Sequence, residues 1–232
     1  MHRLFLSLVV LGLLSGPLAA RPVTAAPPSR AGVTCVESTG MESATVVLDP
    51  GHGGFDSGAT ATLSDGTVLL EKDLNLAVAV MVRDTLASQG IAVALTRSGD
   101  TALGNSERGD IANACRASVL VLIHFNSSSD PAIDYTKTFW GKKRKDLAFS
   151  SHMNEALAAG ILSVDGFSTI ANGGVGQFAH GALLQATMPS TLAETVFLSN
   201  PEEAKALRDP YGPRAQEIAT AIAGGIATWP GI

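Results

Sequence analysis

The chain has 232 residues, of which 46% are hydrophobic and 16% are charged, and its net charge at pH 7 is −5. This length and composition are sufficient for one large domain or two small ones with a sizeable buried core. The acidic balance makes nucleic acid a poor candidate for a binding partner.

The N-terminal segment has the pattern of a secretory signal peptide. A short basic region precedes an apolar stretch, residues 4–14, that is too short to span a bilayer comfortably. Small residues follow and offer cleavage near Ala20 or Ala25, so we predict that residues 1–25 are removed and that the protein acts in the periplasm or cell wall. An uncleaved membrane anchor is the alternative. No other segment reaches transmembrane length, and we expect no stable membrane insertion after cleavage.

Residues 26–44 are rich in Ser, Thr, Pro and Gly and predict a flexible N-terminal arm. The arm contains Cys35, and the second cysteine of the chain is Cys115. In an exported protein an even number of cysteines suggests a disulfide. The two cysteines are 80 positions apart, and the chain-entropy model predicts that a disulfide closing so long a loop stabilises the fold by roughly 4–5 kcal/mol. Two buried free thiols are the alternative.

Predicted strands and helices alternate from residue 45 to residue 230. The apolar run 45–49 predicts a strand that leads into a Gly-rich loop, "PGHGGFDSG". Residues 71–90 have apolar positions at helical spacing and end in Gly90, as expected for a capped helix. Residues 118–125 are almost continuously apolar and predict a central strand covered on both faces.

The remaining elements complete the pattern. We predict strands at 91–98 and 190–199, helices at 106–117, 147–162, 200–207 and 213–228, and an irregular segment at 128–146. No internal repeat or second domain is evident. The sequence therefore predicts a single α/β domain over residues 45–230 with a mainly parallel sheet.

Four side chains are expected to converge at one edge of this sheet. His52 follows the first strand, His124 and Glu194 lie near the carboxyl ends of two other strands, and Glu71 opens the first long helix. Two imidazoles and one carboxylate suit Zn²⁺ and leave a fourth position for water. An acidic group that does not bind the metal could take a proton from that water. Asp73 is the carboxylate that competes with Glu71 for the metal.

A phosphate-binding cradle is the alternative function for the Gly-rich loop. The loop lacks the Gly-Lys-Ser/Thr ending of a P-loop, and no helix starts directly after it. The sequence therefore favours the metal site.

Six motifs in order along the chain carry a resemblance to a known family. They are "LDPGHGGFDSGA", "EKDLNLAVA", "TRSGD", "ERGDIANA", "IHFNSS" and "ETVFLSNPEE". Together, from about residue 45 to 228, they resemble the zinc-dependent N-acetylmuramoyl-L-alanine amidases, in particular the amidase family 3 catalytic domain, and more narrowly a mycobacterial or related member.

The resemblance implies a twisted, mostly parallel sheet of about six strands with helices on both faces. It implies that His52, Glu71 and His124 bind one Zn²⁺ per chain and that Glu194 is the catalytic acid and base. It also implies the substrate, which is peptidoglycan or a muropeptide cleaved between N-acetylmuramic acid and L-alanine of the stem peptide. Cell-wall remodelling, cell separation or recycling would be the biological role.

Two further residues are candidates for contact with the substrate or with the metal ligands. Asn126 lies two positions after His124 in the same predicted strand, and His180 lies in "GQFAHGALLQ". Other function classes stay open, namely a non-catalytic wall-binding protein and a zinc peptidase, although the HExxH helix of common zinc peptidases is absent. We expect a monomer.

Overall fold

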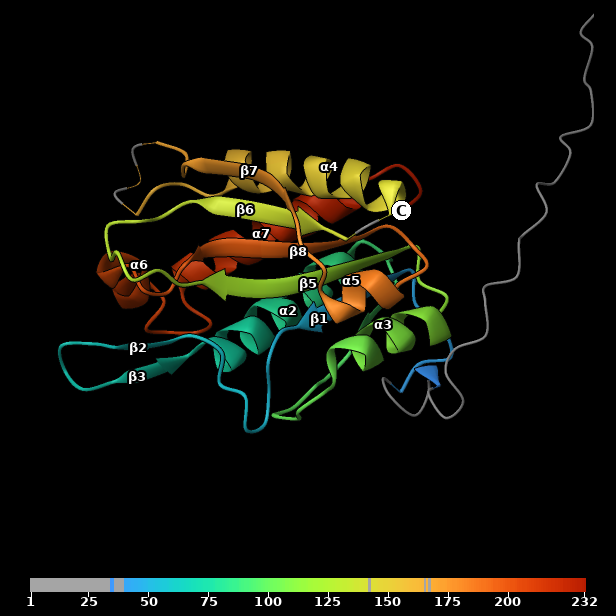
Figure 1. Ribbon diagram of the computed structural model, residues 1–232, viewed down its shortest axis with the longest axis horizontal. Helices are drawn as coiled ribbons and strands as arrows, with labels where there is room; N and C mark the ends of the chain where they lie inside the picture. The colour runs from blue at the N-terminus through green and yellow to red at the C-terminus, as the bar shows by residue number, and fades with distance from the viewer. Residues whose placement is uncertain (1–33, 36–39, 142, 165, 167) are drawn as a thin grey trace, which may run out of the picture.

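A six-stranded sheet forms the centre of the molecule, as the computed structural model in Figure 1 shows. The structure describes residues 34–35, 40–141, 143–164, 166 and 168–232. The strands are β1 (Val46–Pro50), β4 (Val93–Leu95), β5 (Val119–Asn126), β6 (Thr136–Trp140), β7 (Asn172–Gln177) and β8 (Ser190–Phe197). They lie in the order β4-β1-β5-β8-β6-β7, and all neighbours are parallel except β6 and β8. The predicted α/β class with a mostly parallel sheet is confirmed.

Helices cover both faces of the sheet. The helices are α2 (Glu71–Ser88), α3 (Asn105–Ala114), α4 (Arg144–Gly160), α5 (Gly181–Gln185), α6 (Pro201–Ala206) and α7 (Pro213–Ala227). α2, α4 and α7 pack on one face, and α3 and α5 pack on the other. None of the helices in the described part of the chain is both long and apolar enough to cross a membrane.

The alternation of side chains along the strands explains the two layers. In β1, Val46 and Leu48 belong to the core under α2, α4 and α7, whereas Val47 belongs to the core under α3 and α5. In β5, Ile123 and Leu122 divide in the same way. A strand buried on both faces has no polar side, which accounts for the continuous apolar run in the sequence.

A short hairpin precedes the first long helix. β2 (Thr60–Thr62) and β3 (Val68–Leu70) pair antiparallel, and Figure 1 shows them projecting from the body of the molecule. β3 runs directly into α2, and the N–H of Glu71 donates to the carbonyl oxygen of Ala59 at 2.9 Å. The hairpin therefore fixes where α2 begins.

The prediction was wrong for part of the segment between β5 and β8. Residues 128–146 were expected to be irregular, but they contain β6 and the first turn of α4, which begins at Arg144 rather than at residue 147. β7 and α5 were not predicted at all. β7 has the sequence NGGVGQ, and its glycines have low strand propensity, so its pairing with β6 defines it.

The described part of the N-terminal arm is attached to the domain. Cys35 and Cys115 form the expected disulfide, and both residues are buried. The N–H of Ala44 donates to the carbonyl oxygen of Cys115 at 3.2 Å. The predicted signal peptide, residues 1–25, and most of the arm lie outside the described residues.

Candidate functional site

The four predicted site residues meet at the carboxyl ends of the central strands. His52 lies in the loop after β1, His124 lies in β5, and Glu71 is the first residue of α2. Glu194 lies in β8 directly beside His124 in the parallel register. Since neighbouring residues in register point to the same face of a sheet, the glutamate and the histidine share one side.

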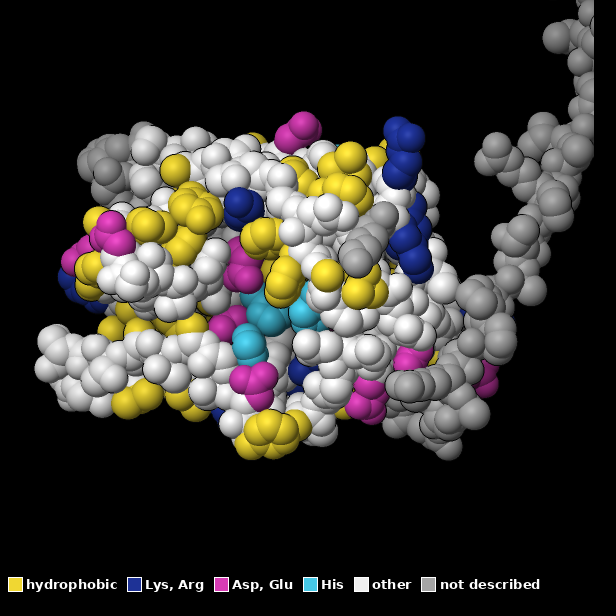
Figure 2. All heavy atoms as spheres, viewed as in Figure 1, with side chains coloured by type: hydrophobic (Ala, Val, Ile, Leu, Met, Phe, Trp, Pro, Cys, Tyr) yellow, Lys and Arg dark blue, Asp and Glu magenta, His cyan; other side chains and the backbone are white. Residues whose placement is uncertain are grey.

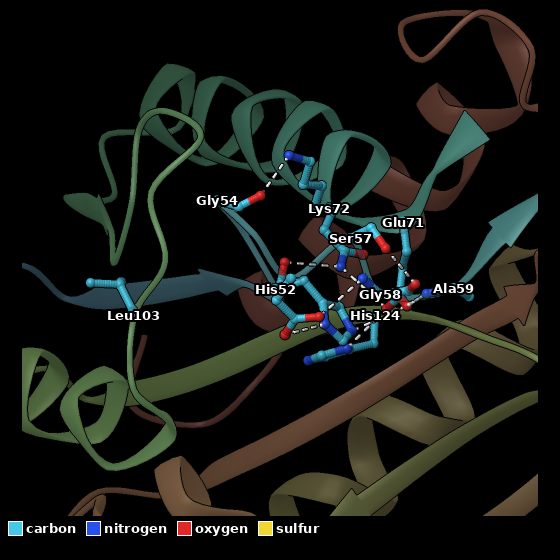
Figure 3. Close-up of polar contacts among 12 residues, drawn as sticks. His52, Gly54, Ser57, Gly58, Ala59, Glu71, Lys72, Leu103 and His124 are labelled. Carbon is cyan, nitrogen blue, oxygen red and sulfur yellow. Dashed lines mark hydrogen bonds and ion pairs between the residues drawn. The ribbon is translucent and has the colours of Figure 1, made fainter. Parts of the chain in front are cut away.

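His52, Glu71 and His124 form a compact group that could hold a metal ion. One ligand atom from each lies within 4.8 Å of the others. Nε2 of His52 is 3.1 Å from Oε2 of Glu71, and Nδ1 of His124 is 3.0 Å from Oε1 of Glu71. Figure 3 shows the three side chains pointing toward one another. Asp73, the competing carboxylate, is not part of this group.

Glu71 is held in place by neighbouring hydrogen-bond donors. The backbone N–H of Ala59 donates to Oε2 at 2.8 Å, and the N–H of Phe125 donates to Oε1 at 3.1 Å. The side-chain amide of Asn75 also donates to Oε1 at 3.3 Å. The carboxylate is therefore oriented by donors from the segment before β2, from β5 and from α2 itself.

Two glycines of the loop pack so closely against this group that a side chain would not fit. A Cβ on Gly51 would lie 2.2 Å from Cε1 of His124, and a Cβ on Gly58 would lie 2.4 Å from Oε2 of Glu71. His52 itself has φ of 60°, in the left-handed region that favours glycine. The loop is thus rich in glycine because its backbone runs against the ligand side chains.

Two buried arginines fix the backbone of the same loop. Arg97 donates from Nε to the carbonyl oxygen of Pro50 and from Nη2 to that of Gly51, each at 2.9 Å. Arg108 donates from Nη2 to the carbonyl oxygen of His52 at 2.9 Å and from Nη1 to Oδ1 of buried Asp49 at 2.8 Å. The carbonyls of three consecutive residues are therefore held by charged donors.

The electrostatics of the group favour a cation. Burial disfavours the charge on Glu71, but the hydrogen bonds and positive charge of His124 and His52 outweigh it, and the pKa of Glu71 falls well below its ordinary value. Burial likewise opposes protonation of His52, but Glu71 and Asp56 outweigh it and raise the pKa of His52 to about 9. Nδ1 of His52 lies 2.9 Å from Oδ2 of Asp56, which leaves Nε2 facing Glu71.

Glu194 is a partly buried carboxyl group beside the histidines. Its Oε2 atom is buried and has no hydrogen-bond partner among the described residues. Burial is the main reason that the pKa of Glu194 lies above its ordinary value. An unpaired carboxyl oxygen in such a place is available to a ligand.

A cavity of about 290 Å³, which we call the metal cavity, lies over this group. Its lining residues are His52, Asp56, Asn105, Arg108, His124, Phe178, His180, Leu192 and Glu194. Figure 2 shows histidine side chains at the surface near the centre of one face, with acidic side chains beside them.

The two candidate contact residues are placed differently. His180 lines the metal cavity, and its ring centroid is 6.3 Å from that of His124. Nδ1 of His180 accepts from the N–H of Ala182 at 3.3 Å. Asn126 does not line this cavity, and its Oδ1 accepts from the N–H of Ser127 at 2.8 Å. The strand register shifts between His124 and Asn126, so a regular two-residue alternation does not apply there.

Sequence reasoning missed several residues that line the metal cavity. Asp56 and Arg108 stand in the quoted motifs "HGGFDSG" and "ERGD", so the motifs contained a signal for both. Phe178 lies in the segment after β7, where no element was predicted, and only its aromatic character next to His180 could have marked it.

Comparisons with known proteins point to one family. Residues 46–228 match the family model described as N-acetylmuramoyl-L-alanine amidase. AmiA of Escherichia coli, an N-acetylmuramoyl-L-alanine amidase, is 31% identical over 225 residues, covering 79% of this chain and 75% of AmiA. An uncharacterized Bacillus subtilis protein, YqiI, is 34% identical over 194 residues, covering 82% of this chain and 86% of YqiI.

A solved structure agrees with these matches. The catalytic domain of CwlV, an N-acetylmuramoyl-L-alanine amidase from Bacillus (Paenibacillus) polymyxa, superposes with a TM-score of 0.68 and 33% sequence identity. The superposition covers 78% of this chain and 95% of the CwlV domain. The similarity therefore includes almost the whole of that catalytic domain.

Proposed function

This chain belongs to the N-acetylmuramoyl-L-alanine amidase family, and we propose that it is a secreted, zinc-dependent peptidoglycan hydrolase. The enzyme class, an N-acetylmuramoyl-L-alanine amidase acting on peptidoglycan, follows from the family. The bond cleaved would be the amide between the lactyl group of N-acetylmuramic acid and L-alanine of the stem peptide. The metal, the residue roles, secretion and a part in wall remodelling, cell separation or recycling are our proposal.

The donor set supports Zn²⁺ as the metal. His52, Glu71 and His124 offer two imidazole nitrogens and a carboxylate, the combination that leaves zinc an open fourth position. Asp56 on the far nitrogen of His52 orients that ring, as carboxylate partners of zinc-binding histidines do. When bound, zinc would act as a Lewis acid toward the lactyl carbonyl and toward water.

Glu194 would move the proton that the reaction requires. Its carboxylate would accept a proton from the water that attacks the lactyl carbonyl carbon, and would then deliver it to the L-alanine nitrogen as the C–N bond breaks. The products would be the muramyl carboxylate and a stem peptide with a free amine. Burial raises the pKa of Glu194, which suits a group that must hold a proton between these two steps.

One observation carries this proposal. Oε2 of Glu194 is buried and unpartnered among the described residues, and Glu194 lies in register with His124 at the wall of the metal cavity. A structural carboxylate of that burial would be expected to have a partner.

The test is a digest of purified muropeptides by the protein with and without zinc, followed by mass analysis. We expect free stem peptides that begin with L-alanine, and only when the metal is present. Cleavage within the stem would instead indicate a zinc peptidase, and binding without any product would indicate a wall-binding protein.

The role of Glu194 is tested by Glu194→Gln, with the exposed Glu155→Gln of α4 as the matched control. We expect the first variant to retain stoichiometric zinc and to lose about 10²–10⁴-fold in turnover. The control should keep full activity. Full activity in Glu194→Gln would remove this residue from the mechanism.

Two features of the N-terminal part of the chain support export. The Cys35–Cys115 disulfide suits an oxidising compartment, and the signal-peptide pattern precedes it. N-terminal sequencing of the exported protein is expected to show a first residue just after Ala20 or Ala25.

A further inference from the structure

A second cavity, larger than the metal cavity, lies between the β2–β3 hairpin and α6. Its volume is about 780 Å³, within the usual range for ligand sites, whereas the metal cavity has about 290 Å³. We call it the hairpin cavity. The smaller space suits the reacting amide and its immediate neighbours, so a muropeptide must extend beyond it.

The hairpin cavity is lined by residues that directly follow the strands of His124 and Glu194. Ser127 and Ser128 follow the strand of His124, and Ser199 follows the strand of Glu194. Strands rise about 3.3 Å per residue, so three residues from His124 correspond to about 10 Å. Figure 1 shows the hairpin and α6 near the same end of the sheet, beyond the arrowhead of β5.

The walls of this cavity are polar and carry charges of both signs. Arg208 and Asp65 form an ion pair of 2.5 Å between the segment after α6 and the hairpin. On α6, Lys205 lies 3.6 Å from Glu202. Both pairs are largely exposed, and exposed pairs of this kind are weak, so a charged ligand could replace one partner.

A hydrogen bond joins two of the residues that line the cavity. The N–H of Ser128 donates to Oγ of Ser199 at 2.9 Å, which ties the end of β5 to the end of β8. Leu198 and Ala204 add buried apolar surface to the lining. The lining of the cavity therefore combines hydroxyls, paired charges and a small apolar surface.

We infer that the hairpin cavity binds the stem peptide beyond its second residue. This inference rests on the proposed function, which puts L-alanine at the metal cavity. An extended peptide spans about 3.3–3.6 Å per residue, so its third and fourth residues reach about 10 Å from the cleaved amide. These residues bear the free carboxylates, and in diamino acids the amine, that the charged pairs can accept.

The part of the metal cavity that Phe178 lines suits the sugar better. Phe178 lines that cavity and is 49% exposed, and it offers an aromatic face to the apolar face of a pyranose ring. The neutral sugar has no charge to match Lys205 or Arg208. The peptide is therefore the occupant that the chemistry of the hairpin cavity favours.

A series of substrates with different stem lengths tests the inference. The substrates are N-acetylmuramoyl-dipeptide, -tripeptide and -tetrapeptide, and kcat/KM is measured for the zinc-loaded protein. We expect kcat/KM to rise about tenfold from the dipeptide to the longer stems, because only these reach the hairpin cavity. Hydrolysis of the dipeptide tests the proposed function separately.

Thr62→Trp provides the blocking variant. Thr62 is exposed and lines the hairpin cavity, and a Trp is tolerated in a strand. We expect the variant to lose the gain for long stems and to keep dipeptide turnover within about twofold. Thr220→Trp, an exposed position on α7, is the matched control and should keep the whole profile.

Several results would overturn the inference. One is a flat length profile in the unmodified protein, and another is an equal loss for all substrates in Thr62→Trp. If no substrate is hydrolysed, the proposed function fails. Calorimetry with the free stem tetrapeptide then still tests whether the hairpin cavity binds the peptide: binding to the unmodified protein that is lost in Thr62→Trp supports the inference, and equal binding or no binding overturns it.

Discussion

The two walls of the metal cavity are built in opposite ways. One wall is the loop of residues 50–58, in which the carbonyl oxygens of the first three residues are held by Arg97 and Arg108. The other is the segment that follows β7, the edge strand of the sheet, and presents Phe178 and His180 to the cavity. The first wall is locked by buried charged hydrogen bonds, whereas the second is a largely exposed segment.

The two walls therefore serve different tasks, one toward the proposed metal ligands and the other toward the substrate. The locked wall holds His52 against Glu71, and both are residues that we propose bind the metal. The exposed wall contributes side chains that a substrate can touch without any change at the proposed ligands. We therefore expect changes in the first wall to affect stability and metal content, and changes in the second to affect substrate affinity or pH response.

The largest effect is expected from Arg108→Met. The change leaves buried Asp49 without its charged partner and frees the carbonyl oxygen of His52. Breaking a buried ion pair typically costs about 3–5 kcal/mol. Denaturant unfolding should show that loss, and zinc content should fall with it. Arg144→Met, at the exposed start of α4, is the control and should leave both quantities unchanged.

Gly51→Ala should have the next largest effect. The added Cβ would lie 2.2 Å from the ring of His124, so the imidazole or the loop must move. We expect a stability loss of about 1–3 kcal/mol, as for other overpacked sites, together with weaker zinc binding in a chelator competition. Gly99→Ala adds the same atom where nothing lies within 4 Å and should change neither. Unchanged zinc affinity in Gly51→Ala would show that the loop is not locked.

The group of His52, Glu71 and His124, against which the locked wall packs, was the part of the site that the sequence predicted best. His52 and His124 lie at the carboxyl ends of apolar strands, and Glu71 begins a helix with clear periodicity, so topology alone brings them together. The role of Arg108 was not predicted, because its partner Asp49 lies 59 positions away and no local pattern reports such a pair.

The exposed wall was harder to predict for a physical reason. β7 has three glycines in six residues and lies at the sheet edge, so neither propensity nor hydrophobic alternation marks it. His180 was one of two candidates, and only the tertiary fold separates it from Asn126. Local sequence signals therefore fail for a strand such as β7, which is defined by its hydrogen bonding to a neighbouring strand and not by buried apolar side chains.

His180 should make the stability of the protein depend on pH. Burial and the charge of His124 lower the pKa of His180 from 6.5 to about 4 in the fold, so the unfolded chain binds this proton more readily. The contribution of neutral His180 to the free energy of unfolding is fully present above pH 6.5 and is lost as the pH falls toward 4.

His180→Asn isolates this effect, because Asn can still accept from the N–H of Ala182 but does not titrate. Between pH 7.5 and 5, the metal-free variant should lose about 1–2 kcal/mol less than the unmodified protein. Denaturant unfolding at both pH values gives the difference. Equal losses in the two proteins would show that His180 is protonated as easily in the fold as in the unfolded chain.

Phe178→Ala should have the smallest effect on the protein itself and a selective one on the substrate. The ring is half-exposed, and its described aromatic neighbours are Phe139 at 5.9 Å and His180 at 6.0 Å between centroids. Since no proposed ligand depends on it, zinc content and kcat should stay the same. If the ring packs on the sugar, KM should rise about 2–10-fold, the equivalent of one aromatic contact. The rise should be the same for muramoyl substrates of every stem length, because all of them carry that sugar. A fall in kcat with loss of zinc would instead mean that the exposed wall supports the metal group, and the division between the two walls would be wrong.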